Sequence, residues 1–323
     1  MMKQKKETGD SVMDHIRNEY HLKSSTGITD LFVQSVVPAE ESAVVGVLEI
    51  VHGMAEHTDR YLEAAGYLCD RGFAVYMHEH AGHGRSVAKD EDLGYFGEKD
   101  GNERLVDDVK SVAQLAKSKH SGKKLVVWGH SMGSFIARRF AAKYPGVADG
   151  FIFCGTSGAN PAAALGALIA DTIGKVKGGH YRSPFINNLA FGSYNKKFNG
   201  STGFEWLSVN EENVRKYVAD DKCGYLFTAY GYRDLFRLLG SVSGKDWYEA
   251  VPKNLPIYLI AGSMDPVGNY GKGVTEVRDK LVQSGHTDVT MKLYDGLRHE
   301  IHNEDCRFDV YADIAAFAEK VVR

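Results

Sequence analysis

Short apolar runs alternate with amphipathic segments over most of the chain. The runs are four to eight residues long and rich in β-branched and aromatic side chains, which is typical of strands buried in a sheet. They span residues 31–37, 44–51, 73–77, 125–128, 151–154, 257–262 and 289–294. Apolar residues recur at helical spacing within residues 61–72, 103–118, 132–140, 274–283 and 310–321. Strands that alternate with helices in this way predict right-handed βαβ units, and therefore a mostly parallel sheet with helices on both faces.

Two parts of the chain depart from this rhythm. Residues 1–20 are polar and are expected to form a flexible N-terminus, and the run 31–37 ends at Pro38, which favours an edge strand. Between residues 155 and 254 there is no strand of comparable quality, and this stretch is far longer than a crossover connection needs. Its apolar positions predict several short helices. We therefore expect an α/β core of residues 21–154 and 255–323, and an inserted helical cap of residues 155–254.

Composition narrows the class of protein. The 323 residues are 43% hydrophobic and 25% charged, as in a globular protein with a substantial core. The formal net charge is −3 without a basic stripe, which argues against a nucleic-acid partner. No apolar run is long enough to span a bilayer, and no apolar run precedes Ile28, which argues against a signal peptide. The four cysteines lie far apart without a Cys-x-x-Cys pair, which favours reduced thiols and a cytoplasmic location.

A Gly-x-Ser-x-Gly pentapeptide, residues 129–133, lies between the strand run 125–128 and the helical segment that follows it. In that context the motif predicts a nucleophile elbow, a tight turn that lifts the serine hydroxyl clear of the sheet. Ser131 is therefore the candidate nucleophile. Read alone, the pentapeptide also fits an ordinary turn, so the assignment depends on finding the other catalytic groups.

A serine hydroxyl needs a base and a group that orients the base. In a parallel sheet such groups collect on loops at the carboxyl ends of strands. Asp265 follows the run 257–262, and His299 follows the run 289–294, so the order Ser131, Asp265, His299 matches a nucleophile-elbow triad. His302 is the alternative base. Asp295 is the alternative acid, although it lies close to the strand end.

An oxyanion formed at Ser131 needs hydrogen-bond donors that are already in place. The backbone N–H of Met132, directly after the nucleophile, is one candidate donor. The backbone N–H of Met54 is the second, because Gly53 lets the chain turn inward after the strand 44–51. The alternative interpretation of His52-Gly53 is a turn that only ends the strand.

Five motifs together resemble the monoacylglycerol lipase and lysophospholipase branch of the α/β-hydrolases, a group similar to the serine aminopeptidases of family S33. They are His52-Gly53-Met54-Ala55-Glu56-His57 with Arg60-Tyr61, His80-Ala81-Gly82-His83-Gly84-Arg85-Ser86, Gly129-His130-Ser131-Met132-Gly133, Ser263-Met264-Asp265-Pro266 and His299-Glu300-Ile301-His302. The resemblance extends into the cap at residues 202–208 and 221–224. Glu79 stands where the family more often has Asp.

The resemblance implies an α/β-hydrolase fold and an ester hydrolase that uses no cofactor and no metal, with a helical cap over an acyl pocket. It implies that Glu56, Arg60 and His302 bind the alcohol head group. The expected substrate is a monoacylglycerol, a lysophospholipid or another small-molecule ester, with a carboxylesterase of small or aromatic esters as the alternative. Residues 161–173 are either the buried face of a cap helix or a peripheral contact with membranes, where such lipids partition.

Two alternatives belong to other functional classes. His78-x-His80-x-x-His83 approaches the metal-binding motif of metallo-β-lactamase-like enzymes, but Gly82 occupies the position of the aspartate. His299 and His302 lie three residues apart, whereas the zincin motif requires four. A non-catalytic binding protein on the same fold is the second alternative, although no member of the triad is missing.

Overall fold

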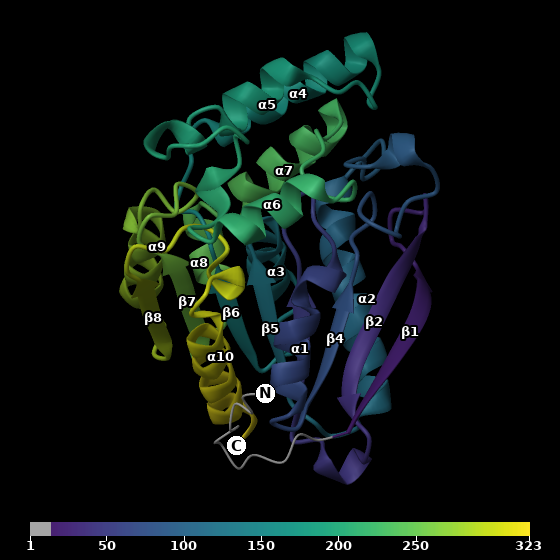
Figure 1. The fold of residues 1–323 in the computed structure, drawn as a ribbon, viewed down its shortest axis with the longest axis vertical. Coiled ribbons are helices and arrows are strands. Elements are labelled where there is room, and N and C mark those ends of the chain that lie inside the picture. Colours follow the sequence, from purple (N-terminus) through teal and green to yellow (C-terminus); the bar gives the residue numbers. More distant parts are fainter. Residues whose placement is uncertain (1–13) are drawn as a thin grey trace, which may run out of the picture.

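An eight-stranded β-sheet runs through the centre of the protein (Figure 1). The structure is a computed structural model that describes residues 14–323. The strands are β1 His15–Lys23, β2 Asp30–Pro38, β3 Gly46–Val51, β4 Phe73–His78, β5 Leu125–His130, β6 Gly150–Cys154, β7 Ile257–Gly262 and β8 Val289–Tyr294. Their order in the sheet is β1-β2-β4-β3-β5-β6-β7-β8. The pairs from β4 through β3, β5, β6 and β7 to β8 are all parallel. Strand β2 is antiparallel to both of its neighbours, β1 and β4. The predicted fold class is confirmed.

The N-terminal edge of the sheet differs from the sequence-based expectation. The predicted flexible segment 1–20 is wrong from His15 onward, because β1 begins there and pairs with β2 along its whole length. Residues 1–13 lie outside the described part of the chain. The prediction that 31–37 is an edge strand is also wrong, since β1 covers it. Most side chains of β1 are polar and partly exposed, so the strand lacks the apolar run that reveals a buried one.

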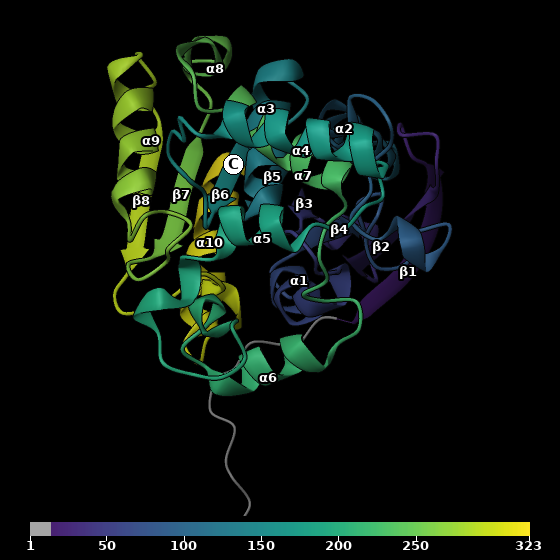
Figure 2. The same cartoon turned by 90° about the horizontal axis from the view of Figure 1, so that it is seen from above.

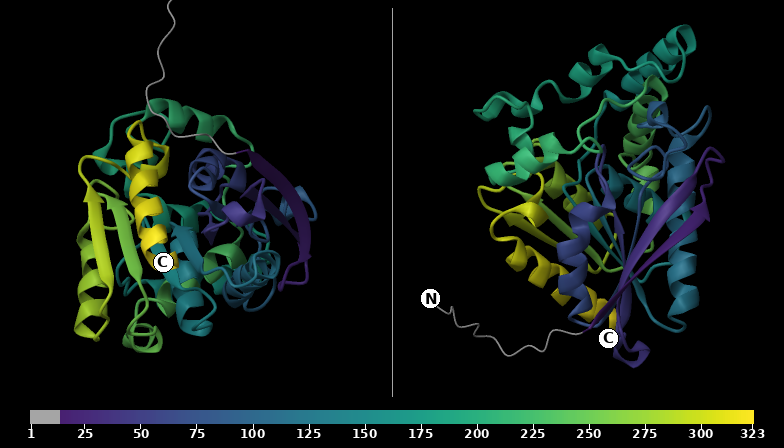
Figure 3. Two further views of the ribbon diagram at one scale, coloured as in Figure 1. Left: turned by 90° about the horizontal axis from the view of Figure 1, so that it is seen from below. Right: turned by 45° about the vertical axis from the view of Figure 1, so that its right-hand side comes forward.

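Helices cover both faces of the sheet and bury a separate apolar core on each (Figure 2). One face packs against α2 Gly101–Lys119, α3 Met132–Lys143 and α9 Lys272–Gln283. The other face packs against α1 Leu62–Cys69 and α10 Arg307–Val322, which also contact each other (Figure 3). The α/β part of the chain also contains short 3-10 helices, at Glu41–Ala43, Thr58–Tyr61, Asp90–Asp92 and Ile301–Asn303. Central strands are therefore apolar on both faces, as their sequence predicts.

The chain between β6 and β7 rises above the carboxyl ends of the strands. It contains α4 Ala163–Lys177, α5 Pro184–Phe191, 3-10 turns at Tyr194–Lys197 and Glu205–Leu207, α6 Glu211–Ala219, α7 Ala229–Ser241 and α8 Lys245–Ala250. Figure 1 shows α4 and α5 at the outer end of the molecule, with α6 and α7 between them and the sheet. The last helix, α8, instead packs against α3, and Trp247 Nε1 donates a hydrogen bond of 2.6 Å to the carbonyl of Arg138. Within the segment 155–254, α8 therefore belongs to the layer that flanks the sheet.

The helices were compared with the length and hydropathy of membrane-spanning helices. Across residues 14–323, none of the helices combines the length and the apolar character that crossing a bilayer requires.

Candidate active site

Ser131 sits in a strained turn between β5 and α3. Its backbone has φ 54° and ψ −122°, a conformation that a residue with a side chain rarely adopts. The Ser131 N–H donates a hydrogen bond of 2.9 Å to the carbonyl of Cys154 at the end of β6. Glycine is required on one flank by close packing, because a Cβ on Gly133 would lie 2.0 Å from the carbonyl oxygen of Val51. The first turn of α3 is thus pressed against β3, and the serine is held at the rim of the sheet.

Asp265 and His299 meet on loops that follow β7 and β8. His299 Nδ1 lies 2.9 Å from Asp265 Oδ2, and both side chains are buried. The other oxygen of Asp265 accepts a hydrogen bond of 2.9 Å from the Val267 N–H, which fixes the carboxylate. Because the carboxylate accepts the proton of Nδ1, Nε2 of His299 is left as the proton acceptor.

Electrostatics around His299 favour its protonated form. Burial opposes protonation, but the Asp265 carboxylate and its hydrogen bond outweigh burial, with smaller contributions from Glu300 and Glu56. The pKa of His299 is therefore raised above its ordinary value of 6.5. A base with a raised pKa accepts a proton more readily in the transition state. At mildly acidic pH, however, a larger fraction of it is already protonated and cannot act as a base.

Ser131 and His299 line a common cavity of about 590 Å³ beneath the cap. Met54 and Met132 line it as well, next to Ser131. The N–H of Met132 lies in the first turn of α3, where backbone donors have no partner within the helix. The N–H of Met54 donates to no acceptor in the described part of the chain. Both N–H groups thus lie beside Ser131 without a backbone acceptor in the described residues.

Two histidines shape the loop that carries Met54. His80 N–H donates to Nε2 of His52 at 3.1 Å, and the ring of His80 donates back to the His52 carbonyl at 3.0 Å. Nδ1 of His52 lies 2.8 Å from the Gly53 carbonyl. Burial, and the positive charge that His83 would carry, lower the pKa of His52, so the ring is neutral. The nitrogens of His78, His80 and His83 do not converge as a set of three metal ligands in the part of the chain that the structure describes.

Arg60 links three loops at the back of the cavity. Its guanidinium donates to Glu56 Oε2 at 2.8 Å and to both oxygens of Glu300, at 2.7 and 2.5 Å. It also donates to Asn213 of α6 at 3.2 Å. The remaining oxygen of Glu56 accepts from the Gly53 N–H at 2.5 Å and from the Tyr61 hydroxyl at 2.8 Å. Burial opposes ionisation of Glu300, but Arg60 brings its pKa to about 2.

The three residues expected to bind an alcohol head group are placed differently. Glu56 lines the cavity, yet both of its oxygens already accept hydrogen bonds from the protein. Arg60 and His302 do not line the cavity at all. His302 is fully buried and stacks on Tyr61, with ring centroids 4.9 Å apart. The prediction that Arg60 and His302 bind the head group directly is therefore wrong, because both side chains lie behind the residues that line the cavity.

The rival catalytic groups are also separated from the site. Asp295 is exposed and accepts a hydrogen bond of 3.1 Å from the Ser263 hydroxyl. His302, the alternative base, faces Tyr61 and Trp128 in the core. Of the carboxylates considered, Asp265 is the one that pairs with His299.

Sequence reasoning overlooked how the cap holds the histidine loop. The ring of Trp206 packs against His299 at a tilt of 42°, with ring centroids 5.1 Å apart. Arg298 donates to the carbonyls of Glu205 and Ser208, at 2.6 and 2.8 Å. The Glu300 N–H donates to the Leu207 carbonyl at 2.7 Å. In the sequence, these contacts are indicated by Arg298 and Glu300, which flank His299. The residues of the cap that they contact lie about ninety residues away in the chain.

Comparison with known proteins places this geometry in a family. The sequence profile of the serine aminopeptidase S33 hydrolases matches residues 42–306, most of the chain. The chain belongs to this family. This S33-family hydrolase is 27% identical over 280 residues to a monoacylglycerol lipase of Mycolicibacterium smegmatis, a match that covers 84% of this chain and 87% of that protein. It is 29% identical over 259 residues to the monoglyceride lipase of Homo sapiens, which covers 79% and 75% of the two chains.

Solved structures agree with the sequence matches. A carboxyl esterase from Bacillus coagulans superposes on the S33-family hydrolase with a TM-score of 0.89 at 29% identity, over 95% of this chain and 99% of that one. A lipase in an open form superposes with a TM-score of 0.85 at 30% identity, over 95% and 100%. The protein is therefore an α/β-hydrolase of the lipase and esterase type, and the predicted resemblance to monoacylglycerol lipases is confirmed.

The Arg60 cluster predicts a large difference between two arginines. Arg60→Ala leaves Glu300 buried beside Glu56 without a counter-charge, and we expect a loss of about 3–5 kcal/mol in the free energy of unfolding. Arg307→Ala removes an exposed pair with Glu63, and we expect a loss below about 1 kcal/mol. Urea denaturation measures both. Equal losses in the two variants would contradict the role given to the cluster.

The raised pKa of His299 predicts an acid limb in the pH profile. A histidine that acts as a general base must be neutral, so kcat/KM for a short-chain nitrophenyl ester should rise with pH through a pKa above 6.5. Asp265→Asn removes the carboxylate that raises this pKa, so the acid limb should shift to lower pH as the rate falls. A wild-type inflection at or below 6.5, or one that Asp265→Asn leaves in place, would refute this account.

Proposed function

We propose that the protein is a serine hydrolase that cleaves carboxylic esters of the monoacylglycerol type through an acyl-enzyme on Ser131. The observation that carries the proposal is the hydrogen-bonded pair of Asp265 and His299, which shares one cavity with a serine on a strained elbow. Nucleophile, base and orienting acid thus come from three separate strand ends. This is the arrangement that acyl transfer requires.

The chemistry follows from the donors and acceptors present. Ser131 Oγ attacks the ester carbonyl while Nε2 of His299 takes its proton, and Asp265 holds the imidazole and stabilises the resulting cation. The negative charge on the carbonyl oxygen is stabilised by the free N–H groups of Met54 and Met132. His299 then gives the proton to the departing alcohol. Water repeats the sequence on the acyl-enzyme and releases the acid.

The lining of the cavity supports a monoacyl lipid as the substrate. Its outer part is apolar and is lined from α4, α5 and α7 by Leu165, Ile169, Leu189, Leu235, Phe236 and Leu239. Polar side chains line another part of the cavity, among them Tyr194 and Asn195. An acyl chain is accommodated by the first region, and a small hydroxylated alcohol by the second. The names of the relatives, monoacylglycerol lipases, and a related carboxyl esterase solved with glycerol, agree with this division.

Ser131 and His299 should act as a unit. Ser131→Ala and His299→Ala are each expected to lower kcat on monoacylglycerol by on the order of 10⁶, and the double variant by no more than either single one. A fluorophosphonate should label the wild type and not Ser131→Ala. Ser284→Ala, at the end of α9 and far from the cavity, serves as the matched control and should retain both activity and labelling. A loss below tenfold, or labelling of Ser131→Ala, would refute the assignment.

The outer face of the cap supports a peripheral contact with lipid surfaces. Exposed apolar side chains gather on α4, α5 and the turn between them, namely Leu165, Leu168, Val176, Tyr181, Phe185 and Leu189. Leu165 and Leu189 also line the cavity, so this apolar face leads toward the acyl region. Soluble proteins rarely expose such a contiguous patch without a partner. The substrate class suggests a lipid bilayer or micelle as that partner.

Liposome binding tests this contact. Leu168→Asp and Phe185→Asp place charge on the exposed face without touching the cavity lining, and we expect the combined variant to bind liposomes at least about tenfold more weakly, given the cost of burying a charge. Its turnover of a soluble short-chain ester should be unchanged. Val282→Asp, at an equally exposed apolar position on α9, is the control. Equal binding by the folded variant and the wild type would remove the proposal.

A further inference from the structure

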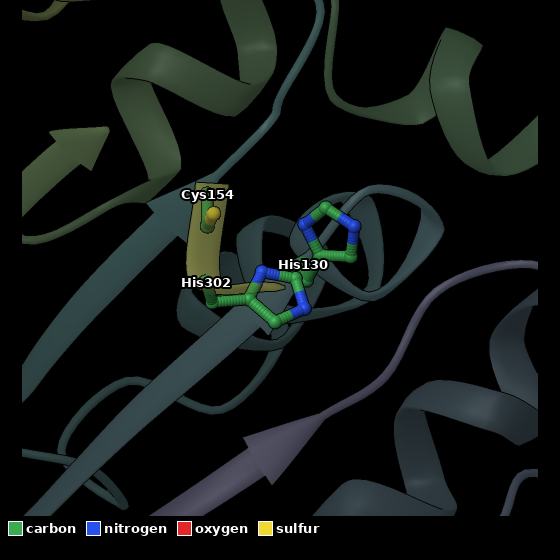
Figure 4. A group of neighbouring side chains, drawn as sticks. All are labelled: His130, Cys154 and His302. Atoms are coloured by element: carbon green, nitrogen blue, oxygen red, sulfur yellow. The ribbon is translucent and has the colours of Figure 1, made fainter. Parts of the chain in front are cut away.

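Three side chains with metal-ligating atoms meet directly behind Ser131. They are His130 from β5, Cys154 from β6 and His302 from the turn before α10 (Figure 4). Their candidate ligand atoms all lie within 4.8 Å of one another. The side chains are at most 1% exposed. Figure 4 shows them grouped around a common point, although they come from distant parts of the sequence.

Three of the four ring nitrogens in this group have no hydrogen-bond partner among the described residues. Within residues 14–323, Nδ1 of His130 and both nitrogens of His302 accept or donate no hydrogen bond. Buried polar atoms are nearly always paired, and exceptions indicate an ion, a water molecule or a functional role. Imidazole nitrogen with cysteine sulfur is the donor set that zinc and related thiophilic cations prefer.

We propose that His130, Cys154 and His302 form a binding site for a thiophilic divalent cation such as Zn²⁺, and that its occupation inhibits ester hydrolysis. The binding itself is independent of the proposed function, whereas the inhibition rests on Ser131 being the nucleophile. On binding, the Cys154 thiol releases its proton to solvent and a sulfur–zinc bond forms. The two imidazoles supply lone pairs, and water fills the fourth position, with no change in oxidation state.

The ligands are attached to the backbone that holds the nucleophile. His130 precedes Ser131, and the Cys154 carbonyl accepts the Ser131 N–H at 2.9 Å. The ring of His130 also packs against His299, with centroids 4.7 Å apart. Drawing three side chains together around one ion therefore displaces the strained elbow and the base at once. A shift of about 1 Å at such a site costs on the order of 10²-fold in rate.

An ion has one evident route to this site. His130 lines the substrate cavity, whereas Cys154 and His302 do not. Entry therefore passes Ser131, and an occupied cavity blocks it. Protein whose Ser131 already carries a bulky phosphonate should bind the ion more slowly than free enzyme.

Cobalt and zinc binding test the site on the intact protein. After treatment with a chelator, Co²⁺ should give one equivalent of a cobalt–thiolate charge-transfer band in wild type and in Ser131→Ala, which separates binding from catalysis. Cys154→Ala should lose the band, and Cys69→Ala, a buried cysteine on α1 remote from the group, should keep it. Removing a residue that hydrogen-bonds to a metal ligand lowers metal affinity by about 10- to 100-fold. Removing the ligand itself should lower the affinity at least as much. We therefore expect Cys154→Ala to raise by about 100-fold the zinc concentration that halves the variant's own metal-free activity.

His302→Phe provides a second variant that keeps the stacking on Tyr61 but removes both nitrogens. It should also lose the cobalt band, which guards against a Cys154→Ala protein that misfolds. Zinc inhibition that persists in both folded variants would show that the ion acts on His299 itself and would overturn the proposal. Absence of the band in wild type would overturn it as well, and would mean that water satisfies the group.

Discussion

The Arg60 guanidinium is the interaction on which the geometry of the site depends. It joins Glu56, which holds the Gly53 N–H, to Glu300, which adjoins His299. Through Asn213 it also reaches the cap. A buried arginine paired with carboxylates adds little stability compared with apolar packing. Removing one of its partners is nevertheless strongly destabilising, because the charge that remains is buried away from water. The loop with Met54, the loop with His299 and the cap are therefore held in one arrangement.

Strain at Ser131 is compatible with this arrangement because the surroundings allow no alternative. The serine adopts a positive φ, which costs of order 1–3 kcal/mol in such regions. The hydrogen bond to the Cys154 carbonyl and the contact of Gly133 with β3 leave the turn little room to relax. Strands β6, β7 and β8 are parallel, so their carboxyl ends lie along the same edge of the sheet. Asp265 after β7 and His299 after β8 therefore need only short loops to reach each other.

The segment above the sheet serves two distinct purposes. Residues 205–213 are bound to the histidine loop by the hydrogen bonds of Arg298 and Glu300 and by the ring of Trp206. This part acts as a fixed wall of the site. Helix α4 instead packs mainly on α7, and α5 packs on α4; both helices expose apolar side chains on their outer face. The outer helices therefore form the roof of the cavity, while the wall beside His299 holds the loop of that residue in place.

Hydrophobic patterning and motif order predicted most of the sheet and the candidate trio. Apolar runs identified the buried strands, and the strand-end loops proposed Ser131, Asp265 and His299, because parallel strands present their carboxyl ends at one rim. In the structure Asp265 pairs with His299, and His299 and Ser131 line one cavity. The sequence did not reveal β1, whose polar residues become a strand only by pairing with β2. Tertiary structure alone decided that Arg60 and His302 lie behind the cavity wall, and that Cys154 joins two histidines. Burial of a polar side chain depends on partners far away in the chain, and local patterns carry no information about them.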